Sequence, residues 1–215
     1  MPYLWCVLMG YLTGTLNPAY LTARLKGVDI KKKGSGNAGA SNALILFGKA
    51  VGVLCALFDM AKAALIIRLA LRLFPDTPHV FALTAAACIL GHIFPFYMKF
   101  RGGKGLACLG GAILAYHPLA FAVMLTLEIV IVMVTKYICF VPITASVLFA
   151  ILYGVLERDP VGGAVLAAVC VVIFCKHVEN LRRIRAGSEL RISYLWNRDG
   201  EIERLRDVYP DGKPR

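Results

Sequence analysis

The chain has 215 residues, of which 59% are apolar and 17% charged, and its mean hydropathy is +0.69. Soluble domains carry about 25% charged residues, so this composition excludes an ordinary soluble protein and indicates an integral membrane protein. The formal charge of +11 does not indicate nucleic-acid binding, because the lysines and arginines lie mostly in loops and in the C-terminal tail, as the positive-inside rule requires.

Seven hydrophobic segments predict an all-α protein with about seven transmembrane helices. They lie at approximately 3–25, 43–67, 80–98, 106–116, 118–135, 138–156 and 161–175. The fourth and seventh are short for a full crossing, which leaves tilted, partly re-entrant or longer helices open. The first lacks a basic start, so we expect a retained helix and no cleaved signal peptide. The seven cysteines form no Cys-x-x-Cys pair, and we expect them to be buried apolar side chains.

The distribution of positive charge predicts the orientation. Of the 24 lysines and arginines, 19 fall on one side of this topology, three fall on the other, and Lys49 and Lys62 lie in the second segment. This bias predicts an outside N-terminus and a cytoplasmic C-terminus. We expect one membrane domain (1–191) and a short cytosolic tail (192–215), with Tyr194 and Trp196 at the level of the lipid headgroups.

Three polar segments interrupt the hydrophobic chain, and this topology places all of them at the cytoplasmic face. The first polar segment (31–42) reads KKKGSGNAGASN, and its alternating glycines allow positive φ and close approach of consecutive N–H groups to an anion. It has no Gly-Lys-Ser/Thr Walker pattern. A flexible loop whose lysines only set topology is the alternative. The candidate phosphate contacts are Gly34, Ser35, Gly36, Asn37, Gly39 and Asn42.

The second polar segment (99–105) reads KFRGGKG and precedes a helix predicted to begin at Leu106. Amides at the amino end of a helix bind anions, because the helix dipole favours negative charge there. A tight cytosolic turn with topogenic charges is the alternative. The candidate anion contacts are Arg101, Gly102, Gly103, Lys104 and Gly105.

The third polar segment (176–187) carries His177 and Asn180 at a spacing of i, i+3, which places both on one helical face. A histidine there can move a proton or hold a phosphate oxygen, although an interfacial histidine at a helix end is the alternative. Asp59 and Lys62 share the same spacing within a predicted span. Charges inside a membrane are costly, so we expect a mutual pair or a role in the site; Glu128 has no predicted partner.

These motifs, in this order and spacing, resemble the bacterial acyl-phosphate:glycerol-3-phosphate acyltransferases, multispan membrane enzymes of the first step of phospholipid synthesis. The resemblance covers about residues 11–191. It rests on VDIKKKGSGNAGASN, the Asp59 and Lys62 pair, GHIFPFYMKFRGGKG, the ITAS stretch near Ser146, and KHVENLRRIRAGSE. It implies acyl transfer from acyl phosphate to the first hydroxyl of glycerol 3-phosphate, giving lysophosphatidate and phosphate, at the cytoplasmic side of a bacterial inner membrane. We expect the protein to contact membrane lipids, and we expect no cofactor, no metal and no nucleic-acid partner.

Acyl phosphate is an activated anhydride, so positioning and charge stabilisation can suffice without a covalent acyl-enzyme. None of the four histidines has an aspartate five residues on, and no Gly-x-Ser-x-Gly is present. On the resemblance, Ser35 and Lys104, with the glycine amides beside them, hold the two phosphates, and His177 contacts the attacking hydroxyl or a phosphate oxygen. Asn42 and Asn180 orient substrate oxygens, and His92, Asp59 and Lys62 support the site from behind.

Several departures from the family pattern lower the polarity near the expected site. Ile45 replaces a family arginine, for which Lys49 or Lys33 is a possible substitute, and Cys139 to Pro142 replace a serine-rich stretch. Cys108 replaces a threonine, and the usual Gly-Ser-Ile-Pro reads Gly-Thr-Leu-Asn from Gly14. Two alternatives therefore remain: a divergent acyltransferase with another acceptor or donor, and a non-catalytic membrane protein that transports or binds anions or lipids.

Overall fold

Helices make up the regular structure of the part of the chain that the computed structural model describes, residues 1–206. Four of them begin with proline in the first turn, where its missing N–H costs no hydrogen bond. The elements are α1 (Pro2–Thr15), α2 (Pro18–Leu25), α3 (Ala40–Phe47), α4 (Lys49–Leu73), α5 (Val80–Ile93), η1 (Phe96–Met98), α6 (Leu106–Tyr116), α7 (Pro118–Thr135), α8 (Phe140–Leu156), α9 (Pro160–Arg185), η2 (Ile192–Leu195) and α10 (Arg198–Arg206).

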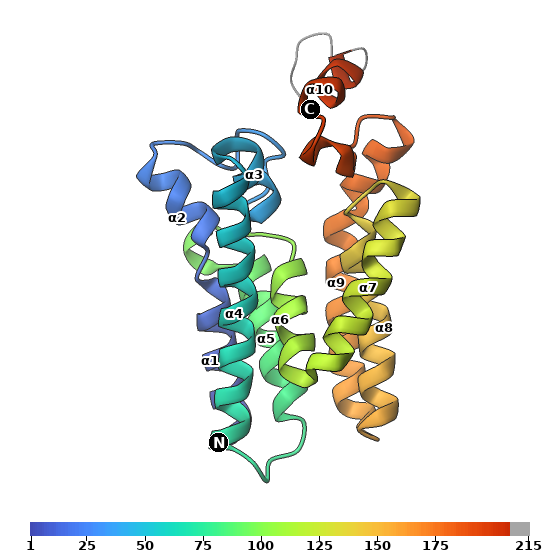
Figure 1. Ribbon diagram of the computed structural model, residues 1–215. Helices are drawn as coiled ribbons and strands as arrows, with labels where there is room; N and C mark the ends of the chain where they lie inside the picture. Colours follow the sequence, from blue (N-terminus) through green and yellow to red (C-terminus); the bar gives the residue numbers. More distant parts are fainter. Residues whose placement is uncertain (207–215) are drawn as a thin grey trace.

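The long helices run side by side along one axis, as Figure 1 shows. α2, α3 and α10 gather at one end of this bundle, and the N-terminus lies at the other end. α1 packs along α5, α4 along α6, and α8 along α9, while α5 also contacts α9 and so joins the two halves. The polar segments therefore reach the same end of the molecule from three different parts of the chain.

Four stretches are long and apolar enough to cross a membrane, namely 49–73, 80–98, 118–135 and 160–185, while α6 and α8 are shorter apolar helices. Large apolar side chains cover their outer faces; for example, Leu65 is 70% exposed and Val134 is 75% exposed. In water such faces would be costly, whereas lipid solvates them well. The described chain has the construction of a helical membrane protein.

The helix boundaries correct three of the predicted segments. The first segment, predicted as one helix over 3–25, is broken at Leu16 and Asn17, where Asn17 caps α2 by accepting a hydrogen bond from the Tyr20 amide at 2.8 Å. The second, predicted over 43–67, is broken at Gly48, whose φ of 95° ends α3. The last, predicted to end at residue 175, continues as α9 to Arg185. Most of the third polar segment is therefore helix.

An aromatic cluster fixes the helices at the end of the bundle opposite the polar segments. Phe81 of α5 stacks on Tyr153 of α8 with ring centroids 5.1 Å apart. Tyr116 of α6 meets both rings edge-on, and Phe149 of α8 meets Phe81 edge-on. Such pairs add about 0.5–1.5 kcal/mol each beyond area burial. These ring contacts fix the positions of α5, α6 and α8 relative to one another, and these helices support the site.

Packing between α7 and α8 gives Glu128 a partner that the sequence did not predict. Glu128 of α7, which had no predicted partner, accepts hydrogen bonds from the Thr144 hydroxyl of α8 at 2.9 and 2.8 Å.

Five of the seven cysteines are buried as expected, but Cys170 is half-buried and Cys175 is exposed on the outer face of α9. The expectation of uniform burial is wrong there, because apolar side chains of a membrane helix can face lipid instead of protein.

Candidate active site

The first polar segment is ordered by one buried side chain, Asn42 of α3. Its Oδ1 accepts from the Ser35 amide at 2.8 Å, and its Nδ2 donates to the carbonyls of Ile30 and Lys33 at 3.0 Å each. Gly34, at φ 59°, passes so close that a Cβ there would lie 2.1 Å from Asn42 Oδ1. The Asn42 amide thus shapes the loop, while the Ser35 side chain remains exposed at its surface.

Two further contacts tie this loop to the bundle. The buried Asn17 amide, in the break between α1 and α2, donates to the Ala38 carbonyl at 2.9 Å. The Lys31 ammonium donates to the Met98 carbonyl at 2.6 Å, directly before the second polar segment. Burial lowers the pKa of Lys31, against the opposing charge of Asp29, and the nearby Arg101 and Lys99 lower it further. The two loops therefore share one region of positive potential.

The glycines of the second polar segment pack against the end of α5. The amides of Gly102 and Gly103 donate to the carbonyls of Ile93 and His92 at 2.9 and 3.0 Å. These two amides are thus engaged within the protein, and the predicted phosphate cradle at 102–105 is left with the amides of Lys104 and Gly105. Gly105 has φ 90° and precedes α6 as its N-cap. The helix dipole of α6 points its positive end toward Lys104.

Gly103 lies against the imidazole of His92. A Cβ on Gly103 would lie 2.0 Å from His92 Nε2, a separation that real side chains do not adopt. Glycine at this position therefore allows the loop to rest directly on the buried histidine. Through this contact, His92 helps to fix the position of the loop that carries Lys104.

Lys104 belongs to a chain of four polar side chains. Its ammonium donates to Asn180 Oδ1, Asn180 Nδ2 donates to Glu189 Oε1 at 2.6 Å, and Arg183 Nε donates to Glu189 Oε2 at 2.6 Å. Burial, together with the charge of Arg183, lowers the pKa of Lys104 to about 8, while the charge of Glu189 opposes the shift. The lysine is thus a partly desolvated cation held by a neutral amide, without an ion pair of its own among residues 1–206.

His177 lies one turn before Asn180 on α9, and both side chains are buried. Its Nδ1 lies 2.8 Å from the carbonyl of Ile173, which can only accept, so Nδ1 carries a proton. In the neutral ring Nε2 is then an acceptor. The predicted pairing of His177 and Asn180 on one face is confirmed by their positions in α9, and the structure adds Lys104 to this face.

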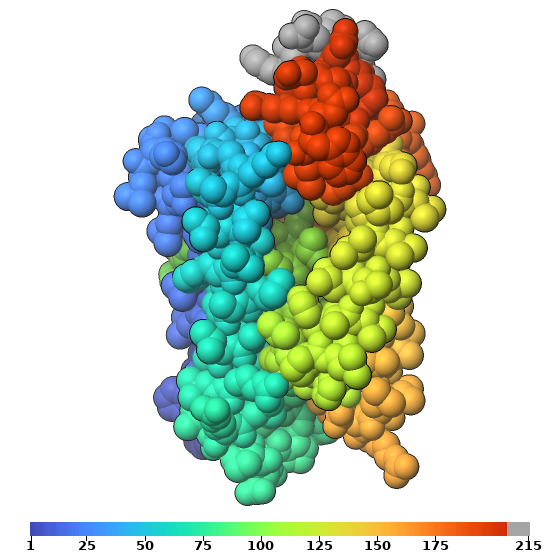
Figure 2. Space-filling view, in the orientation of Figure 1, coloured from blue at the N-terminus to red at the C-terminus, as the bar shows by residue number. Residues whose placement is uncertain are grey.

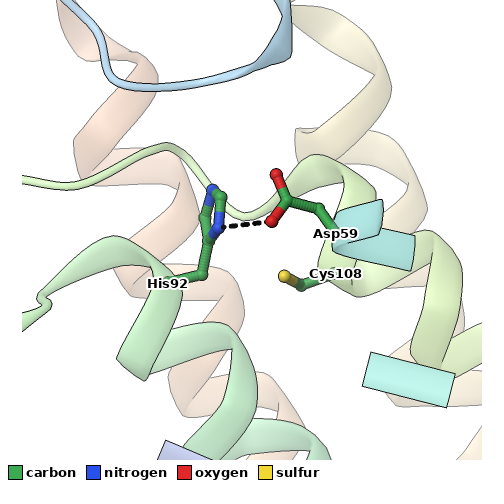
Figure 3. A group of neighbouring side chains, drawn as sticks. All are labelled: Asp59, His92 and Cys108. Atoms are coloured by element: carbon green, nitrogen blue, oxygen red, sulfur yellow. Dashed lines mark ion pairs between the residues drawn. The ribbon is translucent and has the colours of Figure 1, made fainter. Parts of the chain in front are cut away.

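Behind the loops lies a buried charged cluster, part of which Figure 3 shows. Asp59 Oδ1 lies 2.6 Å from the Lys62 ammonium and 3.4 Å from His92 Nδ1. Lys62 also donates to the carbonyls of Gly14, at 3.0 Å, and Leu16. The predicted mutual pair of Asp59 and Lys62 is therefore confirmed. It joins α4 to α5 and to the break after α1.

Asp59, His92 and Cys108 could hold a metal ion by geometry, because one ligand atom from each lies within 4.8 Å of the others and all three are buried (Figure 3). The Lys62 ammonium, however, lies 2.6 Å from the carboxylate and 3.3 Å from His92 Nδ1. It already supplies the positive charge that a metal would bring. The cluster is best described as an internal ion pair with a histidine.

Some predicted site residues are joined by contacts and others are not. Lys104 and Asn180 are hydrogen-bonded, and His177 lies on the same face of α9 as Asn180. Arg101 is exposed, three residues before Lys104. No hydrogen bond or ion pair within residues 1–206 joins Ser35 to Lys104 or His177. Among the described residues, the first loop reaches the start of the second through the hydrogen bond from Lys31 to the Met98 carbonyl and through the buried cluster that Met98 shares with Ile30 and Ala38.

Sequence reasoning missed three side chains in this region. Glu189 and Arg183 complete the Lys104 chain, and Asn17 anchors the first loop. Glu189 lies at the end of the KHVENLRRIRAGSE motif. An acidic residue in this basic motif is the sequence signal that could have identified it. Ile45 and Lys49 belong to separate helices, since Gly48 stands between them, so they are not neighbours on one continuous helix.

Comparisons with known proteins identify the family of this chain. A family model described as glycerol-3-phosphate acyltransferase matches residues 4–187. A glycerol-3-phosphate acyltransferase of Shewanella sediminis is 39% identical over 190 residues, which cover 87% of this chain and 92% of the relative. One of Geobacter sulfurreducens is 36% identical over 183 residues, covering 85% and 94%.

A solved structure gives the same result for the fold. The crystal structure of PlsY (YgiH), an integral membrane glycerol 3-phosphate acyltransferase, in its glycerol 3-phosphate form, matches with a TM-score of 0.81 and 31% identity, covering 90% of this chain and 96% of that one. Its lysophosphatidic acid form matches with a TM-score of 0.78 and 30% identity over the same shares. By fold, motifs and sequence, this chain belongs to the glycerol-3-phosphate acyltransferase family.

Proposed function

We propose that this protein transfers an acyl group from acyl phosphate to the first hydroxyl of glycerol 3-phosphate, in phospholipid synthesis. The observation that carries the proposal is the position of the Lys104 ammonium. It lies at the amino end of α6 and is bonded to Asn180, which shares one face of α9 with His177. A desolvated cation there suits the charge that develops on a leaving phosphate. The family relationship, and relatives named for this reaction, support the same acceptor.

In the proposed reaction, the hydroxyl oxygen of glycerol 3-phosphate attacks the acyl carbonyl carbon. The carbon–oxygen bond to phosphate breaks, phosphate leaves with the bonding electrons, and the hydroxyl proton passes to phosphate or to His177 Nε2. Lys104 balances the charge on one phosphate, with Arg101 and the amides of Lys104 and Gly105 beside it. Orientation of two bound substrates alone is worth several kcal/mol of barrier.

The first polar segment takes the second phosphate in this proposal. The amides of Ser35 and Gly36 are bonded to Asn42 Oδ1 and to the Lys33 carbonyl. The neutral donors that this loop offers are therefore the exposed Ser35 hydroxyl and the amides of residues 34 and 37–39, under the positive potential of the neighbouring lysines. Asn42 acts as a positioning residue, because its amide is bonded to the loop backbone. Asp59, Lys62 and His92 position the second loop from behind, through Gly103.

We further propose seven membrane crossings, with the N-terminus outside and the C-terminus in the cytoplasm of a bacterial cell. α1, α6 and α8, with the four long apolar stretches, supply seven crossings. The exposed lysines and arginines at the end that carries the polar segments support a cytoplasmic position for that end. Acyl phosphate would then reach the site from the lipid and glycerol 3-phosphate from the cytosol.

The test is phosphate release by purified protein in lipid bilayers, with palmitoyl phosphate and glycerol 3-phosphate. We expect turnover that needs both substrates and falls by about 10²–10³-fold in Lys104→Ala, the loss typical of removing one charge-stabilising donor. Lys99→Ala is the matched control, since Lys99 is an exposed lysine of the same segment, and it should retain most activity. Equal activity of Lys104→Ala and wild type would refute the assignment.

A second outcome separates the alternative that Ile45 and Cys139 leave open, an acyltransferase with another acceptor. In that case the protein would hydrolyse or transfer from palmitoyl phosphate at a rate that glycerol 3-phosphate does not change. Binding of palmitoyl phosphate without turnover under any acceptor would instead favour a non-catalytic lipid-binding protein.

A further inference from the structure

A cavity of about 290 Å³ lies outside the site described above, between the junction of α3 with α4 and the C-terminal segment. Gly48 and Lys49 line one wall, and Tyr194, Trp196 and Arg198 line the other. Figure 2 shows the red C-terminal segment overhanging the cyan start of α4. Neither the reaction nor the loops that hold its substrates use these side chains.

Two cations, Lys49 and Arg198, line this cavity without an acidic partner among the described residues. Within residues 1–206, neither Lys49 nor Arg198 forms an ion pair, and no acidic side chain is among the lining residues. Of the acidic side chains of α10, Glu201 is bound by Arg204 at 2.8 Å, and Asp199 and Glu203 do not line the cavity. Two uncompensated cations around one cavity raise its positive potential and favour an anion.

The rest of the lining is amphipathic. Leu44 contributes apolar surface, and Trp196 is 65% exposed. Arg198 lies 5.9 Å from the ring of Tyr194, so an aromatic face orients the guanidinium. Tryptophan and tyrosine favour the interface between lipid and water, because one part of each ring system is apolar and one part hydrogen-bonds. A ligand with both a phosphate and an apolar part fits these walls better than a free ion does.

We propose that this cavity is a binding site for the headgroup of an anionic phospholipid, separate from the acyl-transfer site. The phosphate lies between Lys49 and Arg198, and the glycerol backbone lies against Leu44 and Trp196. The shared chemistry is that of a phosphate ester, and the apolar walls assign it to a membrane lipid instead of a soluble phosphate. Such a lipid would bridge α4 and the C-terminal segment.

The site can be tested by fluorescence, because the chain has only two tryptophans. Trp5 lies in α1 near the N-terminus, at the opposite end of the bundle (Figure 1), so Trp5→Phe leaves Trp196 as the one reporter. The protein is placed in phosphatidylcholine bilayers that contain either phosphatidylglycerol or phosphatidylcholine with a spin label near the headgroup. Phosphatidylglycerol is a diester and neither a substrate nor a product of the proposed reaction, so the two proposals can fail separately.

We expect labelled phosphatidylglycerol to quench Trp196 more strongly than labelled phosphatidylcholine at equal label density. Lys49→Gln and Arg198→Gln should each weaken this preference about fivefold, the effect of one cation at a membrane surface. Arg185→Gln is the control, since Arg185 is an exposed cation of α9 at the same end without an ion pair among the described residues. Thermal unfolding of each variant checks that the fold is intact.

Equal quenching by the two lipids would overturn the proposal. An equal loss in Arg185→Gln would also overturn it, because the preference would then reflect general surface charge. If inorganic phosphate removed the preference for phosphatidylglycerol at unchanged ionic strength, the cavity would take soluble phosphate and the assignment to lipid would be wrong. Persistence of the preference in phosphate, with loss only in the two cavity variants, supports the lipid site.

Discussion

At the residue scale, the chemistry depends on how Lys104 is held. Its ammonium is partly buried and bonded to a neutral amide, with Arg183 nearby and Glu189 one residue further along the chain of contacts. A lysine ammonium in water stays protonated below about pH 10. Burial makes the charged form of Lys104 less stable until an anion binds beside it. The residue is thus prepared for a phosphate and not for a structural ion pair.

This preparation predicts a pH dependence. Burial lowers the pKa of Lys104 to about 8 in the free protein, so the cation is present below that pH and is lost as pH rises through it. We expect kcat/KM to fall above about pH 8, because kcat/KM reports the free enzyme. In kcat the fall should lie at higher pH, since a bound phosphate stabilises the ammonium.

The pH–rate profiles of wild type and Lys104→Arg check this prediction. Arginine stays charged throughout the range, so whatever activity this variant retains should show no alkaline fall near pH 8. An identical alkaline limb in both proteins would assign the ionisation to another group.

At the element scale, the break after α1 and the helices α4 and α5 are joined by one buried ion pair. Lys62 of α4 bonds the carbonyls of Gly14 and Leu16, Asp59 neutralises it, and His92 of α5 completes the contact and supports Gly103. Removing one partner of a buried pair leaves an uncompensated charge, which costs far more than the pair contributes.

We therefore expect Asp59→Asn to lower the free energy of unfolding by about 3–5 kcal/mol. The chain offers a matched control in Lys32 and Asp29, a second pair at i, i+3 that is exposed and 4.0 Å apart. Lys32→Gln should change the free energy by less than about 1 kcal/mol. Chemical unfolding in detergent micelles measures both, and similar losses in the two variants would show that burial of the pair is unimportant.

At the scale of the whole molecule, the C-terminal tail is connected to the site. Arg204 of α10 donates to the carbonyls of Gly187 and Glu189 at 2.7 and 2.8 Å, and the Glu189 carboxylate in turn holds Asn180 and Arg183. The Ile192 amide also donates to the carbonyl of Lys136, the residue that caps the C-terminal end of α7, at 2.8 Å. The predicted division at residues 191 and 192 therefore separates parts that share contacts.

We predict that Arg204→Ala lowers kcat/KM by about tenfold, equivalent to about 1.4 kcal/mol, although Arg204 touches no substrate in the proposed site. Loss of its two hydrogen bonds to the Gly187 and Glu189 carbonyls frees the backbone around Glu189 and loosens the hold on Asn180 and Lys104. Glu203→Ala, an exposed change in the same helix, should have no such effect. Steady-state kinetics decide the matter, and full activity of Arg204→Ala would show that the tail is independent of the site.

Sequence by itself determined the membrane class, the helical architecture and the positions of most candidate site residues. Hydrophobic segments of membrane length and glycine-rich cationic loops are local properties, so they can be read without knowing what packs where. The pairing of Asp59 with Lys62 was likewise predictable, because residues at i, i+3 share a helix face and a lone charge in lipid is costly.

Only the tertiary structure decided which groups are free to bind a ligand. It bonds the amides of Gly102 and Gly103 to α5, gives Asn42 to the backbone of its own loop, and breaks the first two predicted spans at Asn17 and Gly48. It also brings Glu189 and Arg204 to the site from a tail that had no predicted role. These contacts join residues far apart in the chain, and backbone hydrogen bonds of this kind depend on the approach of whole helices rather than on any local pattern of side chains.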